Sequence, residues 1–242
     1  MTTAPAPVSR RHSPHRLLFT SLVVLVVAAV IVGMVLAVRD NGTGTISSSV
    51  VKGSGVAASR TRALPAFTAV DLTGGNNIIV HVGGTQAVVV HGDDNLIAYV
   101  KTAVQAGTLT VGQSRSFSTR SPMSVEITVP ALDAVTLSGS GVLDVDGVEA
   151  GHFTVRAPGS GVLAVTGTAT TLDASLSGTG DVRLDALAVR DATATVSGTG
   201  RLLVNARHSL DATLSGTGSI LYTGEPTKLT KNVTGTGAIT AG

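Results

Sequence analysis

The sequence of 242 residues predicts an all-β fold, a β-solenoid with coils of about 19 residues, preceded by one N-terminal transmembrane helix. Three observations lead to this prediction. A short phrase of the type LSGTG returns at intervals of about 19 residues through the C-terminal half of the chain. Between the copies, apolar residues alternate with more polar ones, which is the pattern of strands with one buried face. Near the N-terminus, the run from Leu17 to Val38 carries no charge.

Residues 17–38 are expected to span a membrane as one α-helix. A helix of about 22 residues is roughly 33 Å long, which is enough to cross the hydrocarbon core. Arg10, Arg11 and Arg16 precede the run, whereas only Arg39 follows it. The positive-inside rule therefore places the N-terminus in the cytoplasm and residues 39–242 on the outer side of the cell membrane. The alternative is a cleaved signal peptide, although this run is longer than the usual signal core of about 7–15 residues.

The remaining chain divides into three parts. Residues 1–16, rich in Pro, Ser, Thr and Arg, are expected to form a disordered cytoplasmic tail. Residues 39–49 include the stretch DNGTGTISSS, which predicts a polar linker between the membrane and a folded domain. Residues 50–242 form that domain, with an irregular part at 50–136 and regular repeats at 137–242.

Composition and charge exclude several classes of function. The chain has no Cys, so it forms neither disulfides nor thiolate metal sites. The net charge of +2 comes from the flanks of the apolar run, because the chain after residue 40 carries 17 − 4 = 13 basic and 15 − 1 = 14 acidic residues. A nucleic-acid-binding domain would carry its own basic patch, so nucleic acid is not an expected partner. Aromatic residues make up 2% of the chain, which favours a thin core between closely packed strands.

The repeated phrase sets the period of the fold. The copies are LSGSG at 137–141, APGSG at 157–161, LSGTG at 176–180, VSGTG at 196–200, LSGTG at 214–218 and VTGTG at 233–237. The final glycines of successive copies are therefore about 19 residues apart, and a period kept through every copy indicates a repeat architecture.

Each repeat holds two short alternating runs, separated by a polar stretch such as DGVEAG or TGTAT. This pattern predicts two short strands and two turns in every coil. An antiparallel meander does not need matched residues in successive repeats, whereas a solenoid stacks equivalent residues about 4.8 Å apart. The second run recurs as Leu-x-Ala-x-Leu or a close variant, as in Leu172, Ala174 and Leu176. This recurrence favours the solenoid, with small middle residues leaving room at the centre of a narrow coil.

The phrase itself is interpreted as the corner of each coil. Glycine would supply a positive φ and the absence of a Cβ where the chain bends and coils lie close. Serine and threonine would hydrogen-bond the backbone of the turn, or one another between coils. The alternative is a ridge of hydroxyl groups that binds sugars or a wall polymer.

Residues 50–136 are expected to be strand-rich but less regular. No stretch after residue 38 has the apolar spacing of a helix. The alternating runs are FTAVDL at 67–72, NIIVHV at 77–82, QAVVVH at 86–91, GTLTV at 107–111 and SVEITV at 124–129, and glycine-containing turns separate them.

A longer series of segments carries a resemblance to a known family. The segments are GSG at 53–55, AVDLTGGNNIIV at 69–80, GDDNLIAYVKTAVQAGTLTV at 92–111, VEITVPALDAVTLSGSG at 125–141 and the repeated SGTG. Together they resemble the bacterial head GIN domain family, which is named after putative auto-transporter adhesins. The resemblance covers about residues 50–242. It implies a right-handed β-helix-like fold on exported or membrane-anchored bacterial proteins, and it brings no established catalytic residue.

A calcium site is not expected. GTGDVRLDA at 178–186 is similar to a glycine-rich calcium repeat, with Asp181 and Asp185 as candidate ligands. Such a repeat needs an acidic residue in coil after coil. At the position of Asp181, the other coils carry Val142, Val162, Arg201, Ser219 and Ala238.

Catalysis is not expected either. Asp173 and Asp211 share an outward column with Asp191 beside them, and a carbohydrate-active enzyme that uses these carboxylates is an alternative. Outward carboxylates are more commonly only solvated. No metal-ligand spacing occurs among His81, His91, His152 and His208. We therefore assign no catalytic, metal-binding or cofactor-binding residue, and no cofactor.

The last repeat differs from the others, because Lys231 stands where earlier coils have Ala, and Pro226 and Lys228 lie nearby. Lys and Pro protect exposed sheet edges. The sequence thus predicts a non-catalytic, single-pass membrane protein whose solenoid acts in adhesion or surface interaction at the cell envelope. Its partner would be a wall or surface glycan, or a protein. The alternative is a scaffold or sensory ectodomain that binds protein partners or self-associates as a homo-oligomer.

Overall fold

The computed structural model describes residues 50–119 and 121–242. These residues belong to a compact unit that begins at Ser48. The tail, the transmembrane helix and the linker predicted within residues 1–49 lie outside the described part of the chain. Among the described residues, no helix has the length and apolar character needed to cross a membrane.

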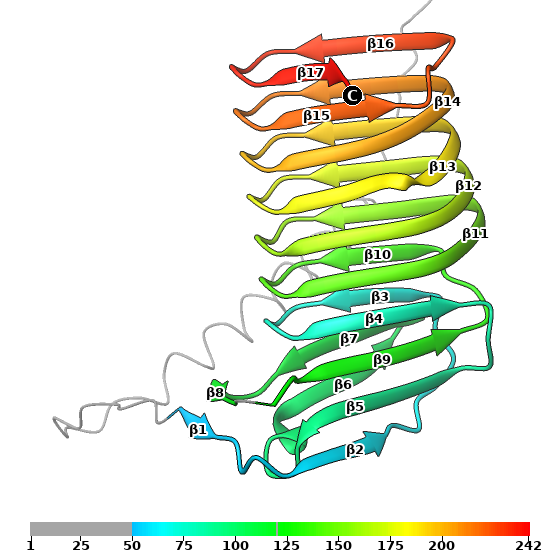
Figure 1. Cartoon of the computed structure of the whole chain (residues 1–242). Coiled ribbons are helices and arrows are strands. Elements are labelled where there is room, and N and C mark those ends of the chain that lie inside the picture. Colours follow the sequence, from blue (N-terminus) through cyan, green and yellow to red (C-terminus); the bar gives the residue numbers. More distant parts are fainter. Residues whose placement is uncertain (1–49, 120) are drawn as a thin grey trace, which may run out of the picture. The chain divides into compact units, whose positions relative to one another are not determined.

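β-strands are the dominant regular structure of the described chain (Figure 1). Its one helical element in this part is the three-residue 3₁₀ helix η2 (Ile97–Tyr99). The N-terminal strands are β1 (Val51–Lys52), β2 (Ala57–Thr61), β3 (Ala69–Leu72), β4 (Asn77–Val82), β5 (Ala87–Asp93), β6 (Val100–Gln105), β7 (Thr108–Gln113), β8 (Phe117–Ser118), β9 (Ser124–Val129) and β10 (Ala134–Leu137). The strands that follow are β11 (Val142–Ala157), β12 (Val162–Leu176), β13 (Asp181–Val196), β14 (Arg201–Leu214), β15 (Ser219–Thr223), β16 (Lys228–Val233) and β17 (Ala238–Ala241).

The repeats stack as parallel strands in one register, which Figure 1 shows as a pile of similar coils. Val142 of β11 pairs with Val162 of β12, which pairs with Asp181 of β13. Asp181 pairs with Arg201 of β14, which pairs with Ser219 of β15. These partners are one sequence repeat apart, so the predicted solenoid is confirmed and the antiparallel meander is wrong. The right-handed sense that the family resemblance implies stays a prediction.

The coils of β11 to β14 have one sharp corner each, whereas the sequence predicts two turns. β11, β12, β13 and β14 continue through the polar stretches and bend there without ending (Figure 1). Shifts of register mark the bends, for example between Val145 and Val148 and between Ala164 and Gly167. In these coils the predicted second turn is wrong, because neighbouring coils offer backbone partners on both sides of the strand and a β-bulge absorbs the bend. In the last coil the turn is present, since β15 ends at Thr223 and β16 begins at Lys228.

The glycine phrase forms the sharp corners. A Cβ added to Gly198 would lie 2.0 Å from the carbonyl oxygen of Gly178, and one added to Gly200 would lie 2.2 Å from that of Gly180. The predicted close approach of the coils at these glycines is therefore confirmed. The predicted positive φ is wrong, because none of the corner glycines from residue 139 to residue 237 has one. Lack of space, and not backbone conformation, requires glycine at the corners.

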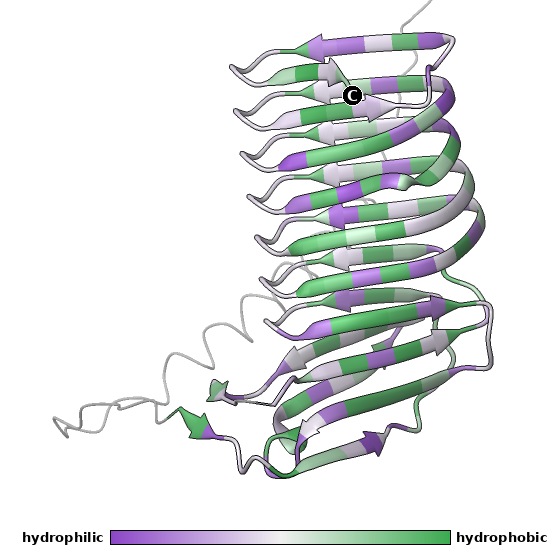
Figure 2. Ribbon diagram, in the orientation of Figure 1, coloured by the Kyte–Doolittle hydropathy of each residue, from purple (hydrophilic) through white to green (hydrophobic). Residues whose placement is uncertain are grey.

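The core lies inside one wrapped sheet of 15 strands, whose two halves face each other across the coil. Figure 2 shows hydrophobic and hydrophilic residues interspersed along the strands. Buried and accessible residues largely alternate along β12 and β13, as expected when every second side chain points inward. Ala174, Ala194 and Ala212 stack in register and are buried at the middle of the core. Larger aliphatic side chains such as Leu176 and Leu214 flank this alanine column and are also buried. The predicted small middle residues of a narrow coil are thus confirmed.

One coil of the stack comes from outside the sequence repeats. β3 and β4, joined by TGGN at 73–76, lie beside β10 and β11, and Val70 pairs with Val135. Between β4 and β10 the chain forms β5 to β9, of which β7 and β9 add the next layer beside β3 and β4. The antiparallel strands β5, β6 and β2 close this side of the stack. Leu96 and Ile97 are buried there and cover the end of the core.

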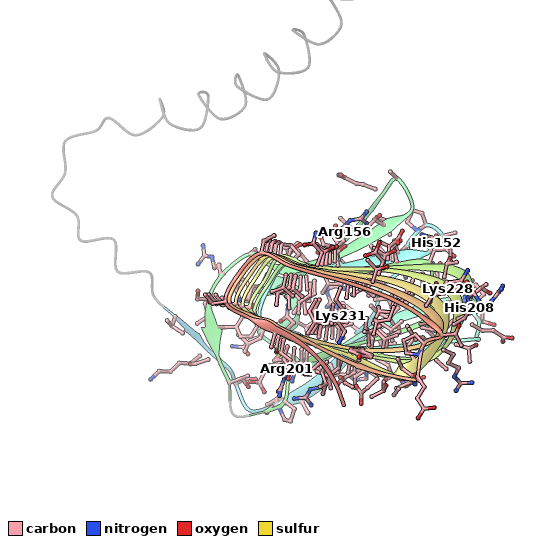
Figure 3. The ribbon with its side chains drawn as sticks, turned by 90° about the horizontal axis from the view of Figure 1, so that it is seen from above. His152, Arg156, Arg201, His208, Lys228 and Lys231 are labelled. Atoms are coloured by element: carbon pink, nitrogen blue, oxygen red, sulfur yellow. The ribbon has the colours of Figure 1, made fainter. Side chains whose placement is uncertain are left out.

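The other end of the stack is formed by β16 and β17, where Leu229 and Val233 are 40% and 45% exposed. Lys231 continues the alanine column at this end, and Figure 3 shows it at the middle of the coil, seen from above. Its Nζ donates to the carbonyl oxygen of Ile239 at 3.3 Å and lies 4.5 Å from the centre of the Tyr222 ring. The predicted replacement of Ala by Lys in the last coil is confirmed. An inward charge here opposes the addition of a further apolar coil.

Candidate binding face

Outward side chains on the second half of each coil form one polar face, which we call the hydroxyl–carboxylate face. Its side chains stand in three parallel columns because β11, β12, β13, β14 and β16 pair in register. The first column is His152, Thr171, Asp191, Ser209 and Lys228; the central column is Thr154, Asp173, Thr193, Asp211 and Thr230; the third column is Arg156, Ser175, Thr195, Thr213 and Asn232.

The register confirms the predicted column of Asp173 and Asp211 and places Thr193 between them. Asp191 stands in the first column, two residues before Thr193 on β13, so it lies beside the other two carboxylates as predicted. Figure 3 shows His152, Arg156, His208 and Lys228 on the outer side of the coils. The carboxylates of this face are therefore accompanied by basic groups in its first and third columns.

The hydroxyl–carboxylate face is hollowed in two places. The larger depression, about 370 Å³, is lined by residues of β12, β13, β14 and β16. The smaller depression, about 180 Å³, is lined by residues of β11, β12 and β13. Asp173 and Thr193 line both, so the two depressions adjoin, and we call them together the furrow. Leu172, Ala192 and Leu210 also line its larger part, although their side chains are buried in the core.

Asp191 is held by donors from the neighbouring coil. Ser209 Oγ donates to Asp191 Oδ1 at 2.6 Å, and His208 Nδ1 lies 2.6 Å from the same oxygen. Arg190 Nε lies 3.6 Å from Asp191 Oδ2. The hydrogen bonds from Ser209 and His208 lower the pKa of Asp191 below its ordinary value of 3.8. This carboxylate is thus ionised and oriented at neutral pH.

The other two carboxylates of the furrow are more open to a ligand. Asp173 Oδ2 has one basic neighbour, His152 Nε2, at 3.6 Å. Asp211 forms no ion pair with any residue that the structure describes. Both side chains are exposed. Their oxygens are therefore available as hydrogen-bond acceptors, between hydroxyl groups that both donate and accept.

The arrangement of these groups favours binding over nucleophilic catalysis. In a Ser-His-Asp enzyme, the serine hydroxyl donates to the histidine, which in turn donates to the aspartate. Here Ser209 donates directly to Asp191, and His208 contacts the same carboxylate oxygen. The lowered pKa of Asp191 is also opposite to the raised pKa of a general acid that works near neutral pH.

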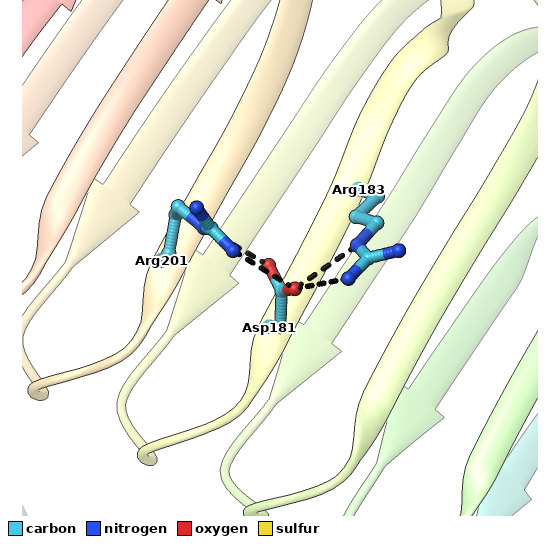
Figure 4. Close-up of polar contacts among 3 residues, drawn as sticks. All are labelled: Asp181, Arg183 and Arg201. Atoms are coloured by element: carbon cyan, nitrogen blue, oxygen red, sulfur yellow. Dashed lines mark hydrogen bonds and ion pairs between the residues drawn. The ribbon is translucent and has the colours of Figure 1, made fainter.

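Asp181, the candidate calcium ligand, lies in an ion cluster on the first half of its coil (Figure 4). Arg183 donates to Asp181 Oδ2 through Nη2 at 2.7 Å, and Nη2 of Arg201 lies 3.3 Å from the same oxygen. Partial burial acts to raise the pKa of Asp181, but the two guanidinium groups outweigh it and hold the pKa below 3.8. Within the described residues, no group of three or more His, Asp or Glu side chains is arranged to hold a metal ion.

Acid is expected to weaken the domain partly through Asp181. Its pKa is lower in the folded than in the unfolded chain, so its stabilisation is complete above 3.8 and is lost as the pH falls through the folded-state pKa. Asp181→Asn should lower the free energy of unfolding by roughly 1 kcal/mol or less near neutral pH. The two proteins should become alike once the pH lies below the folded-state pKa of Asp181. Urea unfolding of both proteins across this range measures the difference, and a difference that does not change with pH would contradict the assignment.

The structure also joins side chains that the sequence analysis leaves apart. His81 Nδ1 lies 2.8 Å from Asp146 Oδ2, and His91 Nε2 lies 3.3 Å from Glu126 Oε2. These residues come from β4, β11, β5 and β9. The alternation of the sequence predicts that their side chains point outward. It does not predict that these strands are neighbours, because their pairing depends on the interleaved N-terminal layers. Each histidine that the structure describes therefore has a carboxylate neighbour.

Comparisons with known proteins agree with this fold. A sequence model of the family described as "Putative auto-transporter adhesin, head GIN domain" matches residues 66–226. The crystal structure of a putative adhesin from Bacteroides fragilis is 25% identical, and the match covers 79% of this chain and 99% of that one with a TM-score of 0.65. A putative adhesin from Parabacteroides merdae is 20% identical, with 79% and 98% covered and a TM-score of 0.50, and supports the fold alone. No curated protein matches the chain.

Proposed function

Because the chain belongs to the family of the putative auto-transporter adhesin head GIN domain, we propose that it is a non-catalytic adhesin of the cell envelope. The surface that binds is the hydroxyl–carboxylate face, and the ligand is a polar polymer of the cell wall or cell surface. The observation that carries this proposal is the furrow, where two adjoining depressions are lined by hydroxyl and carboxylate groups from five strands.

The stacked register supports this proposal, because it holds the binding groups in fixed positions. Each outward side chain stands on a strand that is paired on both sides, except at the ends of the stack. The backbone that carries these side chains is already ordered before a ligand binds, so less binding energy is lost to conformational entropy. A rigid face with many similar groups also suits a polymer that presents many similar units.

The proposal includes the membrane anchor predicted at residues 17–38. Its support is the absence of charge along this run and the arginines before it. The anchor would leave the N-terminus in the cytoplasm and present the solenoid outside the membrane, beyond the polar linker at 39–49. Protease added to intact cells, after removal of any outer barrier, should degrade the solenoid, and a protected solenoid would contradict this topology.

The test of the proposed function is co-sedimentation of purified residues 48–242, a compact unit with its own core, with isolated cell-wall material across a salt series. We expect saturable binding that persists at high salt, because neutral hydrogen bonds are screened less than surface charge pairs. Thr193→Arg places a large side chain where the two depressions adjoin and should abolish binding. Thr168→Arg, at an exposed site outside the furrow, is the matched control and should bind as before. Absence of wall binding would refute the proposal for the cell's own wall.

A second candidate function is self-association through the end of the solenoid. The observation that favours it is the exposure of Leu229 and Val233 on β16. The inward Lys231 opposes it, because two such ends would bring two ammonium groups together. A molecular mass that rises with concentration in light scattering, together with no wall binding, would favour this second function.

A further inference from the structure

The central column of the hydroxyl–carboxylate face has a period of its own. Along the stack it is Thr154, Asp173, Thr193, Asp211 and Thr230, so that hydroxyl and carboxylate groups alternate from coil to coil. The two flanking columns do not alternate in this way. Since neighbouring parallel strands lie about 4.8 Å apart, the chemical pattern of the central column repeats at about 9.6 Å.

From this alternation we propose that the ligand is an extended β-1,4-linked glycan chain that lies along the solenoid axis, with one sugar to each coil. The inference rests on the proposed function and names its ligand. In an extended β-1,4 chain, each sugar is turned by half a turn from the one before it, so the same edge returns at every second sugar. One sugar advances the chain by a length close to one strand spacing. The glycan and the central column thus have similar unit lengths and the same two-unit repeat.

The chemistry of the column fits the edge of such a glycan. Asp173 and Asp211 are acceptors only, and each can bind two hydroxyl or amide hydrogens of a sugar. The threonines between them both donate and accept, and so suit the next sugar, which presents its opposite edge. Thr171, Ser175, Thr195 and Ser209 in the flanking columns add hydroxyl groups along the furrow.

A cationic ligand fits the face less well. Asp191 is already engaged by Ser209 and His208, and Asp173 has His152 as a neighbour. Arg156 lines the smaller depression and Lys228 the larger one, where they would repel a polycation.

No aromatic side chain lines either depression, so sugars cannot stack on a ring in the furrow. Each sugar is therefore held mainly by hydrogen bonds in competition with water, and a single unit binds weakly. Affinity has to accumulate over several coils of one ligand. This reasoning leads to a dependence on chain length that a binding site for one sugar would not show.

The experiment is calorimetric titration of residues 48–242 with β-1,4-linked N-acetylglucosamine oligomers from two to eight sugars. We expect Kd to fall by roughly tenfold or more from the dimer to the tetramer, and to level off once the five coils of the column are occupied. Maltohexaose, whose α-1,4 linkage curves the chain away from a straight column, should bind at least roughly tenfold more weakly than the β-1,4 hexamer.

Variants locate the binding. Asp173→Ala combined with Asp211→Ala removes both carboxylates of the central column and should weaken hexamer binding by roughly tenfold or more, in line with two lost charge-assisted hydrogen bonds. Asp144→Ala, an exposed aspartate in the first half of a coil, is the matched control and should leave Kd unchanged. Because all three side chains are exposed, the circular dichroism spectrum and melting temperature should confirm that the variants fold.

The outcomes separate this inference from the function on which it rests. Binding to whole wall material without binding to any β-1,4 oligomer would overturn the glycan assignment and leave the adhesin proposal standing. Equal affinity for the dimer and the hexamer, or equal loss in the Asp144→Ala control, would overturn the arrangement along the axis. Failure to bind both wall material and oligomers would overturn both proposals.

Discussion

Gly198→Ala is expected to lower the free energy of unfolding by about 3 kcal/mol, which is at the upper end of what overpacking commonly costs. The added Cβ would lie 2.0 Å from the carbonyl oxygen of Gly178 and 2.7 Å from that of Ser177. Both are backbone atoms of the preceding coil, so no side chain can turn away to make room. The corner has to move, and the stacked strands on either side of it have to move with it.

Gly151→Ala is the matched control for this substitution. Gly151 lies in β11, has open space where its Cβ would be, and has no positive φ. Its replacement should change stability by no more than about 0.5 kcal/mol, whereas Gly198→Ala should lower Tm by roughly 6–12 °C in a domain of this size. Thermal and urea unfolding of residues 48–242 measure both effects. Equal midpoints for the two variants would show that the coils can separate at the corners without cost.

The sequence was sufficient to predict the architecture of the repeats. A period in the glycines gave the length of one coil, and the in-phase recurrence of Leu and Ala distinguished a parallel stack from a meander. The sequence was not sufficient to predict the bends, because polar stretches such as TGTAT are compatible with both a turn and a strand. The strand continues there because a parallel neighbour lies on each side, which is a tertiary condition. The interleaved layers of β3, β4, β7 and β9 were missed for the same reason, since they join segments that share no sequence period.

The binding face was predicted in part. The same period that aligns the glycines places Asp173 and Asp211 in one column, so their neighbourhood could be derived from spacing alone. The donors to Asp191 could not, because they depend on the side-chain conformations of His208 and Ser209 on the next coil. The furrow was also missed, since a hollow arises from the relative sizes of side chains in three columns at once.

Fold and site are connected through one property, the register of the stack. In-register pairing is required inside the coil, because leucine must pack on leucine and glycine on glycine. Once it is present, outward residues at the same repeat position also form columns, whatever their chemistry. Thr and Asp can therefore alternate along such a column without any change to the core. Substitution of outward-facing residues alone can thus give a solenoid of this kind a binding site for a ligand with a repeating structure.

Phe153→Ala is expected to destabilise the domain by about 3–5 kcal/mol, the usual range for removal of a buried phenylalanine. Phe153 is fully buried and is among the largest buried side chains of the described chain. It pairs with Leu172 on one side, but on the other side β10 begins only at Ala134, opposite Thr154. The aromatic ring is therefore buried at a point where the strand of the preceding coil has not yet begun. A cavity left there cannot close easily, because β11 is held in register with β12 along most of its length.

Phe153→Leu is the control, because leucine already occupies the same column at Leu172 and Leu210. It should cost only about 1 kcal/mol, since most of the buried volume is retained. The urea concentration at the midpoint of unfolding should therefore be highest for the wild type, lower for Phe153→Leu and lowest for Phe153→Ala. The slope of the free energy of unfolding against urea concentration should be unchanged if the solenoid unfolds as one cooperative unit. A slope that falls in Phe153→Ala would instead mean that the coils on the two sides of β11 unfold separately, as the nearest-neighbour energetics of repeat proteins permit.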